Sequence, residues 1–200
     1  MSAVVARTIR SRRRLVTRLI TSLRRALTWL IEWLLPLSPL WRWLLLKLCS
    51  PRYEPGEWND GHSIQFGNNC YNYACDIQTG TRAQPGTAGG YTPIDISCYE
   101  YTQGAEADGL IIVGCDGPCP FCCHRVALVV APGDDFHWYR QDNDGTWSHK
   151  PGGTLAVDTD ASGNPITDPR TADRDYRSAG GPDYSQFCGC FAVCSCVTIA

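Results

Sequence analysis

A cysteine and a histidine near the middle of the chain have the types and local contexts of a thiol nucleophile and its general base. Cys70 follows two asparagines, one of which is expected to cap a helix over residues 69–77, and His124 opens an apolar stretch typical of a strand. A helix N-terminus and a neighbouring imidazolium both lower the pKa of a thiol. The N–H groups of the helix start would point at an oxyanion, and Gln65 or Asn69 could add a side-chain donor. The pattern predicts attack by Cys70 on a carbonyl carbon, with His124 taking the thiol proton.

The order and spacing of these residues resemble those of a known family. A cysteine at a helix start is followed after 54 residues by a strand histidine, His124, and after 13 more by His137, just past the next turn. This arrangement over about residues 60–150 resembles the papain-like cysteine peptidase and amidase clan, most closely the NlpC-type hydrolases. The resemblance implies a papain-like fold and hydrolysis of a peptide or peptidoglycan amide. It also implies the catalytic set Cys70, His124 and His137, with no cofactor and no metal.

The strand pattern does not determine which polar residue would orient the His124 ring. A hairpin turn centred on Pro132-Gly133 pairs residues whose numbers sum to about 265–267. That register sets one of three polar residues opposite His124: Gln141, Asp142 or Asn143. The resemblance instead points to His137, and a bulge just after the turn could shift the pairing. Both interpretations are kept, with Asp142 and Asn143 as the alternatives to His137.

The twelve cysteines are far more than a chain of this length usually has. Such a number indicates disulfides in an oxidising compartment or a metal site in a reducing one. Within the dense run 115–124, Cys119 and Cys122 have the two-residue spacing of a zinc pair. A second pair could come from the four cysteines of the tail: Cys188, Cys190, Cys194 and Cys196. Disulfides from this run to the tail, or from Cys75 to Cys98, are the alternative expectation.

These cysteines also support two function classes other than catalysis. Cys70 could be a disulfide half or a buried small hydrophobic residue, and His124, beside two cysteines, could be a metal ligand. The chain would then be a non-catalytic binding domain, stapled by disulfides or stabilised by zinc, on a membrane anchor.

The charge of the chain is divided sharply near residue 50. Residues 1–50 carry nine arginines and one lysine against one glutamate, a net charge of +9, whereas the remaining 150 carry 8 basic and 19 acidic residues, a net charge of −11. A basic end is expected to have its own partner, a membrane or a nucleic acid. The acidic remainder argues against nucleic-acid binding by the main domain, because phosphate contacts need clustered cations.

The basic end continues into an apolar run. Residues 1–25 place leucines among the arginines at helical spacing, which predicts a basic amphipathic helix. Residues 26–48 are long enough to cross a bilayer but include three charged residues and two prolines. We expect contact of residues 1–48 with an anionic membrane, as an interfacial hairpin or as a signal-anchor span. A cationic helix packing on the domain or on another chain is the alternative, and Cys49 is a candidate for acylation.

The expected architecture is a separate N-terminal helical segment, residues 1–50, followed by one Cys-rich domain, residues 51–200. A helix carrying Cys70 comes first and short antiparallel strands follow, which predicts an α+β, papain-like fold. Strands are expected at 110–114, 124–130, 136–141, 146–149 and within 187–199. The domain is expected to be membrane-associated and to lie in an oxidising compartment or outside the cell.

Overall fold

The computed structural model describes residues 44, 46–116, 119–120 and 122–200. The basic helix predicted over residues 1–25 and most of the apolar run lie outside the described residues, so the membrane contact of residues 1–48 stays a prediction. Within the described part of the chain, no helix is both long enough and apolar enough to span a bilayer.

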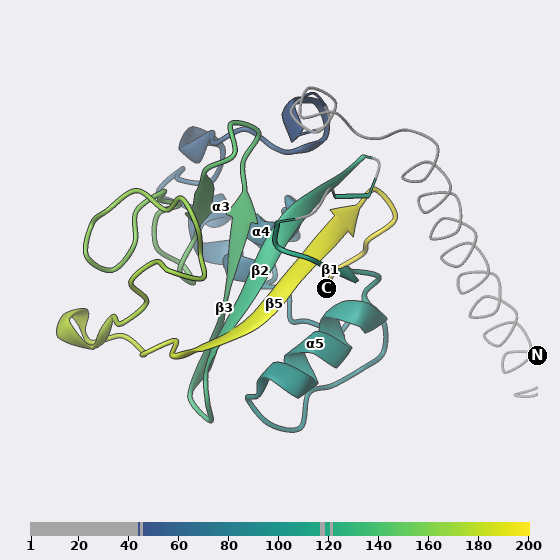
Figure 1. The fold of residues 1–200 in the computed structure, drawn as a ribbon. Helices are drawn as coiled ribbons and strands as arrows, with labels where there is room; N and C mark the ends of the chain where they lie inside the picture. The colour runs from purple at the N-terminus through teal and green to yellow at the C-terminus, as the bar shows by residue number, and fades with distance from the viewer. Residues whose placement is uncertain (1–43, 45, 117–118, 121) are drawn as a thin grey trace, which may run out of the picture. The chain divides into compact units, whose positions relative to one another are not determined.

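The described residues fold around a five-stranded antiparallel sheet in the order β1-β5-β2-β3-β4 (Figure 1). Its strands are β1 (Ile111–Val113), β2 (Cys123–Ala131), β3 (Asp135–Gln141), β4 (Trp147–His149) and β5 (Gln186–Cys194). The helices are η1 (Pro55–Glu57), α3 (Ser63–Gly67), α4 (Cys70–Cys75), α5 (Cys98–Ala107) and η2 (Arg177–Ala179). The predicted α+β class is confirmed, whereas the papain-like arrangement stays a prediction.

The central strand β2 is buried along its whole length because both of its faces are covered. Its even-numbered apolar residues, such as Leu128, pack in a cluster with residues of α4 and α5. Its odd-numbered residues, such as Val129, pack with Ile166 and Tyr184 of the long connection between β4 and β5. Side chains alternate across a strand, so the sheet has a helix face and a loop face.

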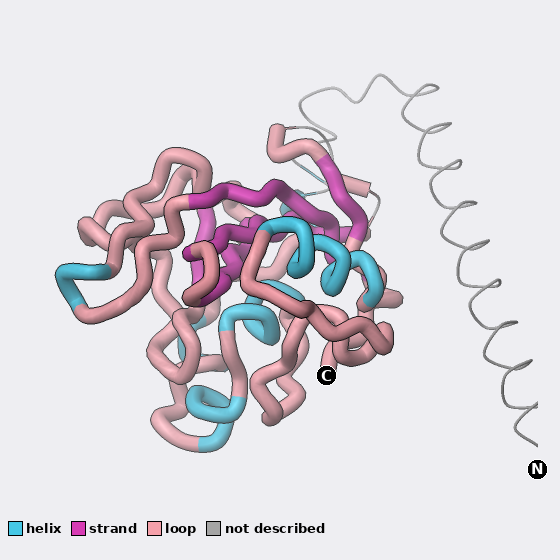
Figure 2. The backbone as a smooth tube through the Cα atoms, turned by 90° about the horizontal axis from the view of Figure 1, so that it is seen from below, coloured by secondary structure: helices cyan, strands magenta, loops and turns pink. Residues whose placement is uncertain are grey.

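The connection over residues 150–185 covers the loop face with little regular structure of its own. It is mostly loop, apart from the short helix η2 (Figure 2). Isolated bridges hold it to the sheet edge, pairing Trp147 with Ile166 and His149 with Val157. This stretch supplies buried side chains that no strand or helix pattern would have indicated.

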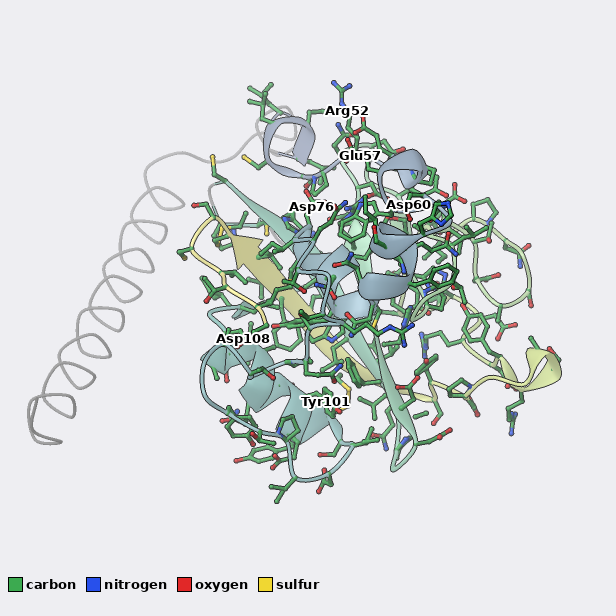
Figure 3. All side chains as sticks on the ribbon, turned by 180° about the vertical axis from the view of Figure 1, so that it is seen from behind. Arg52, Glu57, Asp60, Asp76, Tyr101 and Asp108 are labelled. Carbon is green, nitrogen blue, oxygen red and sulfur yellow. A yellow bond between two sulfur atoms is a disulfide. The ribbon has the colours of Figure 1, made fainter. Side chains whose placement is uncertain are left out.

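On the helix face, a single buried carboxylate joins α4 to α5. Asp108 caps the C-terminal end of α5 and is labelled in Figure 3. Its oxygens accept the Tyr71 hydroxyl at 3.0 Å and the backbone N–H groups of Gly86 and Gly89 at 2.7 and 2.8 Å. The loop between the two helices is thereby tied to both.

The last strand, β5, lies between β1 and β2 and carries a bulge (Figure 1). Leu128 pairs with Gly189 and Val129 with Phe187, which leaves Cys188 as an extra residue. A bulge reverses the facing of the residues on one side of it. As a result, Cys188 packs with the helix-face cluster and Cys190, only two residues later, with the loop-face cluster.

Three disulfides bind this strand to α5, to the loop after β1 and to β2. They are Cys98–Cys188, Cys115–Cys190 and Cys123–Cys194. The expected links from the run 115–124 to the tail are confirmed. The alternative pairing of Cys75 with Cys98 is wrong: Cys98 is joined to β5, and Cys75 is a buried free thiol.

Candidate functional site

The helix carrying Cys70 begins where the sequence indicates, because two asparagine side chains cap it reciprocally. The Asn69 side-chain oxygen accepts from the backbone N–H groups of Tyr71 and Asn72, and the Asn72 side-chain oxygen accepts from the Asn69 N–H. The Asn69 amide nitrogen also donates to the Ala83 carbonyl at 2.8 Å. These bonds satisfy the N–H groups of Tyr71 and Asn72, and they occupy the Asn69 amide that was predicted to serve an oxyanion.

The Cys70 thiol is enclosed in the helix-face core. It is 5% exposed and packs in the same cluster as Trp138, whose backbone N–H donates to its sulfur. Burial raises the pKa of Cys70 to about 12, against the smaller lowering by that N–H. At neutral pH the group is therefore a buried thiol and not a thiolate, which is the opposite of what an activated nucleophile requires.

His124 lies on the same face of the sheet, at the other end of α4. Its Nε2 bonds to the carbonyl of Ala74, four residues after Cys70, at 2.7 Å. Burial lowers the pKa of His124 to about 4, so the ring is neutral at neutral pH and donates to that carbonyl. Trp138, beside the Cys70 sulfur, pairs with Leu128, which at ~3.3 Å per residue is about 13 Å along β2 from His124. Cys70 and His124 thus lie near opposite ends of α4 and not side by side.

His137 faces the opposite side of the sheet. It pairs with Val129 and contacts the rings of Tyr139 and Tyr184 on the loop face. Its Nε2 lies 2.7 Å from Nδ1 of His149, whose own Nε2 donates to the Thr159 carbonyl at 3.0 Å. The structure does not bring His137 to Cys70 or to His124.

The alternative orienting residues are engaged elsewhere. The β2–β3 register sums to 266, as in Val126 with Arg140, which extends to Asp142 opposite His124 as the hairpin arithmetic predicted. The Asp142 carboxylate, however, accepts from Arg140 Nε at 3.1 Å. Asn143 contributes its backbone N–H to the Pro51 carbonyl. Gln65, the other predicted oxyanion donor, bonds to the Gly153 carbonyl.

Two buried cations that the sequence did not single out hold this region together. Lys150 Nζ donates to three carbonyl oxygens within 2.6–2.7 Å, those of Gln65, Asn68 and Gly152. Burial lowers the pKa of Lys150 to about 8. The ammonium thereby joins α3 and the turn before α4 to the end of β4. Only its place directly after the short strand Trp147–His149 could have signalled this role.

The second buried cation is Arg140 on β3. It bonds to Asp142, to Asp76 at the end of α4 and to the Arg52 carbonyl, and its guanidinium lies 4.1 Å from the centre of the Tyr73 ring. Arg52 and Asp76 are labelled in Figure 3. Arg140 therefore joins the incoming chain, the helix and the sheet in one polar network.

Metal binding finds no support in the described residues. They contain no group of three or more histidine, cysteine or acidic side chains placed to hold an ion. Three of the four tail cysteines considered as zinc ligands are in disulfides.

Comparison with known proteins identifies a relative of a different kind. The chain is 48% identical over 147 residues to "Insoluble matrix shell protein 1" of Ruditapes philippinarum, a match that covers 74% of this chain and 93% of that protein. The chain belongs to the family of insoluble matrix shell protein 1. No family model matches it, and no solved structure does.

This kinship corrects the functional prediction. The relative is named for an insoluble shell matrix, and the prediction of a membrane-associated cysteine hydrolase is wrong. The peptide or peptidoglycan substrate loses its basis with it. The geometry agrees, because the thiol and both imidazoles are buried, neutral and bonded to structural partners. The predicted disulfides between the run 115–124 and the tail are confirmed, and the shell-matrix relative and three disulfides indicate an extracellular or otherwise oxidising location.

Proposed function

We propose that this chain is a structural, non-enzymatic component of an insoluble extracellular matrix. The observation that carries the proposal is its 48% identity to a protein named as an insoluble matrix shell protein. The disulfide-stapled, non-catalytic domain that the sequence offered as the alternative to an enzyme is the form that agrees with this kinship.

The stapling of β5 suits such a role. The three disulfides close loops of 90, 75 and 71 residues, and each loop of that size stabilises a fold by roughly 4 kcal/mol if it acts on the unfolded chain alone. The contributions are not additive, because the loops share β5. The physical result is a sheet that stays folded where chaperones and resynthesis cannot maintain it.

Fractionation of the source tissue tests the proposal. Washed extracellular material would be extracted in turn with salt, non-ionic detergent, and denaturant with reductant, and the chain followed with an antibody to residues 51–200. We expect it in the last fraction. Recovery in the salt extract, or release by detergent alone, would count against a matrix role, the latter in favour of a membrane protein.

A matched pair of variants separates structure from chemistry. Cys70→Ser removes the predicted nucleophile, and Cys75→Ser changes another buried thiol of the same helix. If the role is structural, both variants partition into the insoluble fraction to the same extent whenever they fold. Loss of partitioning in folded Cys70→Ser alone would refute it.

A further inference from the structure

The chain segment before the domain is fixed against the open end of the β2–β3 hairpin. The Ser50 N–H closes a helical turn on the Leu46 carbonyl, and two residues further the Pro51 carbonyl accepts the Asn143 N–H at 2.8 Å. Arg140 donates to the Arg52 carbonyl at 3.0 Å. Cys49 is therefore held within two residues of a backbone bond to the β3–β4 turn.

Cys122 reaches the same place from the other strand. The observed β2–β3 pairing ends with Val126 and Arg140, and continuing its register sets Cys123 level with Asn143. Cys122 directly precedes β2, is exposed, and has a left-handed backbone with φ 55°. Two independent backbone paths, one along the incoming segment and one along the hairpin, thus bring residues 49 and 122 together.

The two side chains are neighbours, and both are free thiols in the structure. The Cys49 thiol donates to the Cys122 sulfur, and the backbone N–H of Cys122 donates to the Cys49 sulfur. Cys119 is near enough to act on Cys49 electrostatically, yet only Cys122 bonds to it. The three cysteine pairs that include β5 are oxidised.

We propose that Cys49 and Cys122 form a fourth disulfide, which ties the end of the basic N-terminal segment covalently to the sheet. An oxidant of the disulfide class, as for the other three bonds, accepts the two electrons. The exposed Cys122 thiolate attacks one sulfur of the oxidant and releases the first thiol. The Cys49 thiolate then attacks the Cys122 sulfur and releases the second. Each cysteine loses one proton, one S–S bond forms and the bond in the oxidant is broken.

This bond would have a consequence that the other three do not. Every disulfide already described joins residues after 97, so a cut between residues 50 and 97 frees the N-terminal segment unless Cys49 is linked. With the fourth bond, the segment with its charge of +9 remains attached to the acidic domain. The inference needs only an oxidising location and does not depend on the proposed matrix role.

Alkylation before reduction tests the pairing in the full-length secreted protein. We expect Cys49 and Cys122 to resist alkylation in denaturant and to appear in one cross-linked peptide. In the Cys49→Ser variant we expect Cys122 to become alkylatable, which distinguishes Cys122 from its disulfide-bonded neighbour Cys123. In the control variant Cys119→Ser we expect the cross-linked peptide to persist. Free Cys49 and Cys122 in the oxidised protein, a different partner for Cys122, or stoichiometric bound zinc would overturn the proposal.

A cleavage experiment tests the consequence. A site-specific protease sequence inserted into the exposed stretch 92–95 allows one cut in the folded protein. On a non-reducing gel we expect one band after cleavage for the parent and for Cys119→Ser, and two bands for Cys49→Ser. Two bands for the parent, with its circular dichroism spectrum unchanged by the insertion, would show that the segment is not linked.

Discussion

Three buried histidines predict that the domain loses stability on mild acidification. His124, His137 and His149 are each less than a tenth exposed, and burial lowers the pKa of His124 and His149 to about 4 and that of His137 well below 6.5. Such a ring binds its proton only after unfolding. Its contribution to stability is therefore complete above the unfolded pKa of about 6.5 and is lost as the pH falls toward the folded pKa.

The size of the loss follows from those values. For a pKa of about 6.5 in the unfolded chain and about 4 in the fold, each ring contributes roughly 2 kcal/mol less at pH 5 than at pH 7.5. His124 and His149 together give about 4 kcal/mol. The coupled partner His137 adds to the loss. Buried Asp108 and Asp142, whose pKa values burial raises, act in the opposite direction, mainly at lower pH.

Urea unfolding of the oxidised domain, followed by the fluorescence of its buried tryptophans, measures the effect. With a slope of roughly 2 kcal/mol per molar urea, the midpoint should fall by about 2 M between pH 7.5 and pH 5. His149→Gln should reduce the pH dependence by close to one proton, and His62→Gln, at an exposed position, should leave it unchanged. An equal midpoint at both pH values, or equal pH dependence in His149→Gln and the parent, would refute the reasoning.

Three further predictions concern the supports of the sheet and of α4. Removing one staple as Cys115→Ser with Cys190→Ser should lower the free energy of unfolding by about 4 kcal/mol, measured against the parent in urea; no change would mean that the other two staples fully constrain β5. Lys150→Met leaves three carbonyls without their donor and should cost about 2–4 kcal/mol, whereas a neutral result would assign those carbonyls to water. Asn69→Ala removes the cap of α4 and should cost about 1–2 kcal/mol, and a loss under 0.5 kcal/mol in the same assay would contradict the capping argument.

Local patterns predicted the parts of the fold that local physics determines. The asparagine before Cys70 caps its helix, and the Pro132-Gly133 turn sets the β2–β3 register that the hairpin arithmetic gave. The same register already argues from the sequence against the predicted set of Cys70, His124 and His137. The numbers of paired residues sum to 266, so even-numbered residues of both strands share one face of the sheet and odd-numbered residues share the other. His124 therefore lies on the same face as Asp142 and His137 lies on the opposite face, so the two histidines cannot share a site.

Long-range features could not be predicted in the same way. No local pattern places the last strand between β1 and β2, and the bulge at Cys188 reverses the facing that alternation alone would assign. The helix α5 begins at Cys98, in a short stretch where periodicity alone does not distinguish a helix from a strand. Burial of Lys150 depends on the carbonyls of Gln65 and Asn68, which lie 85 and 82 residues earlier in the chain, and composition cannot reveal such contacts.

The position of β5 has a consequence for how this protein is made. The strand that completes the sheet follows the other four in the chain, and each of the three disulfides needs one of its cysteines. None of those bonds can form natively until β5 has been synthesised, while cysteines as early as Cys49 are already exposed to oxidation. Such long-range closure is slow and favours mispairing in the interval. Production of the native domain should therefore depend on disulfide isomerisation once β5 is available, more than on the rate of oxidation itself.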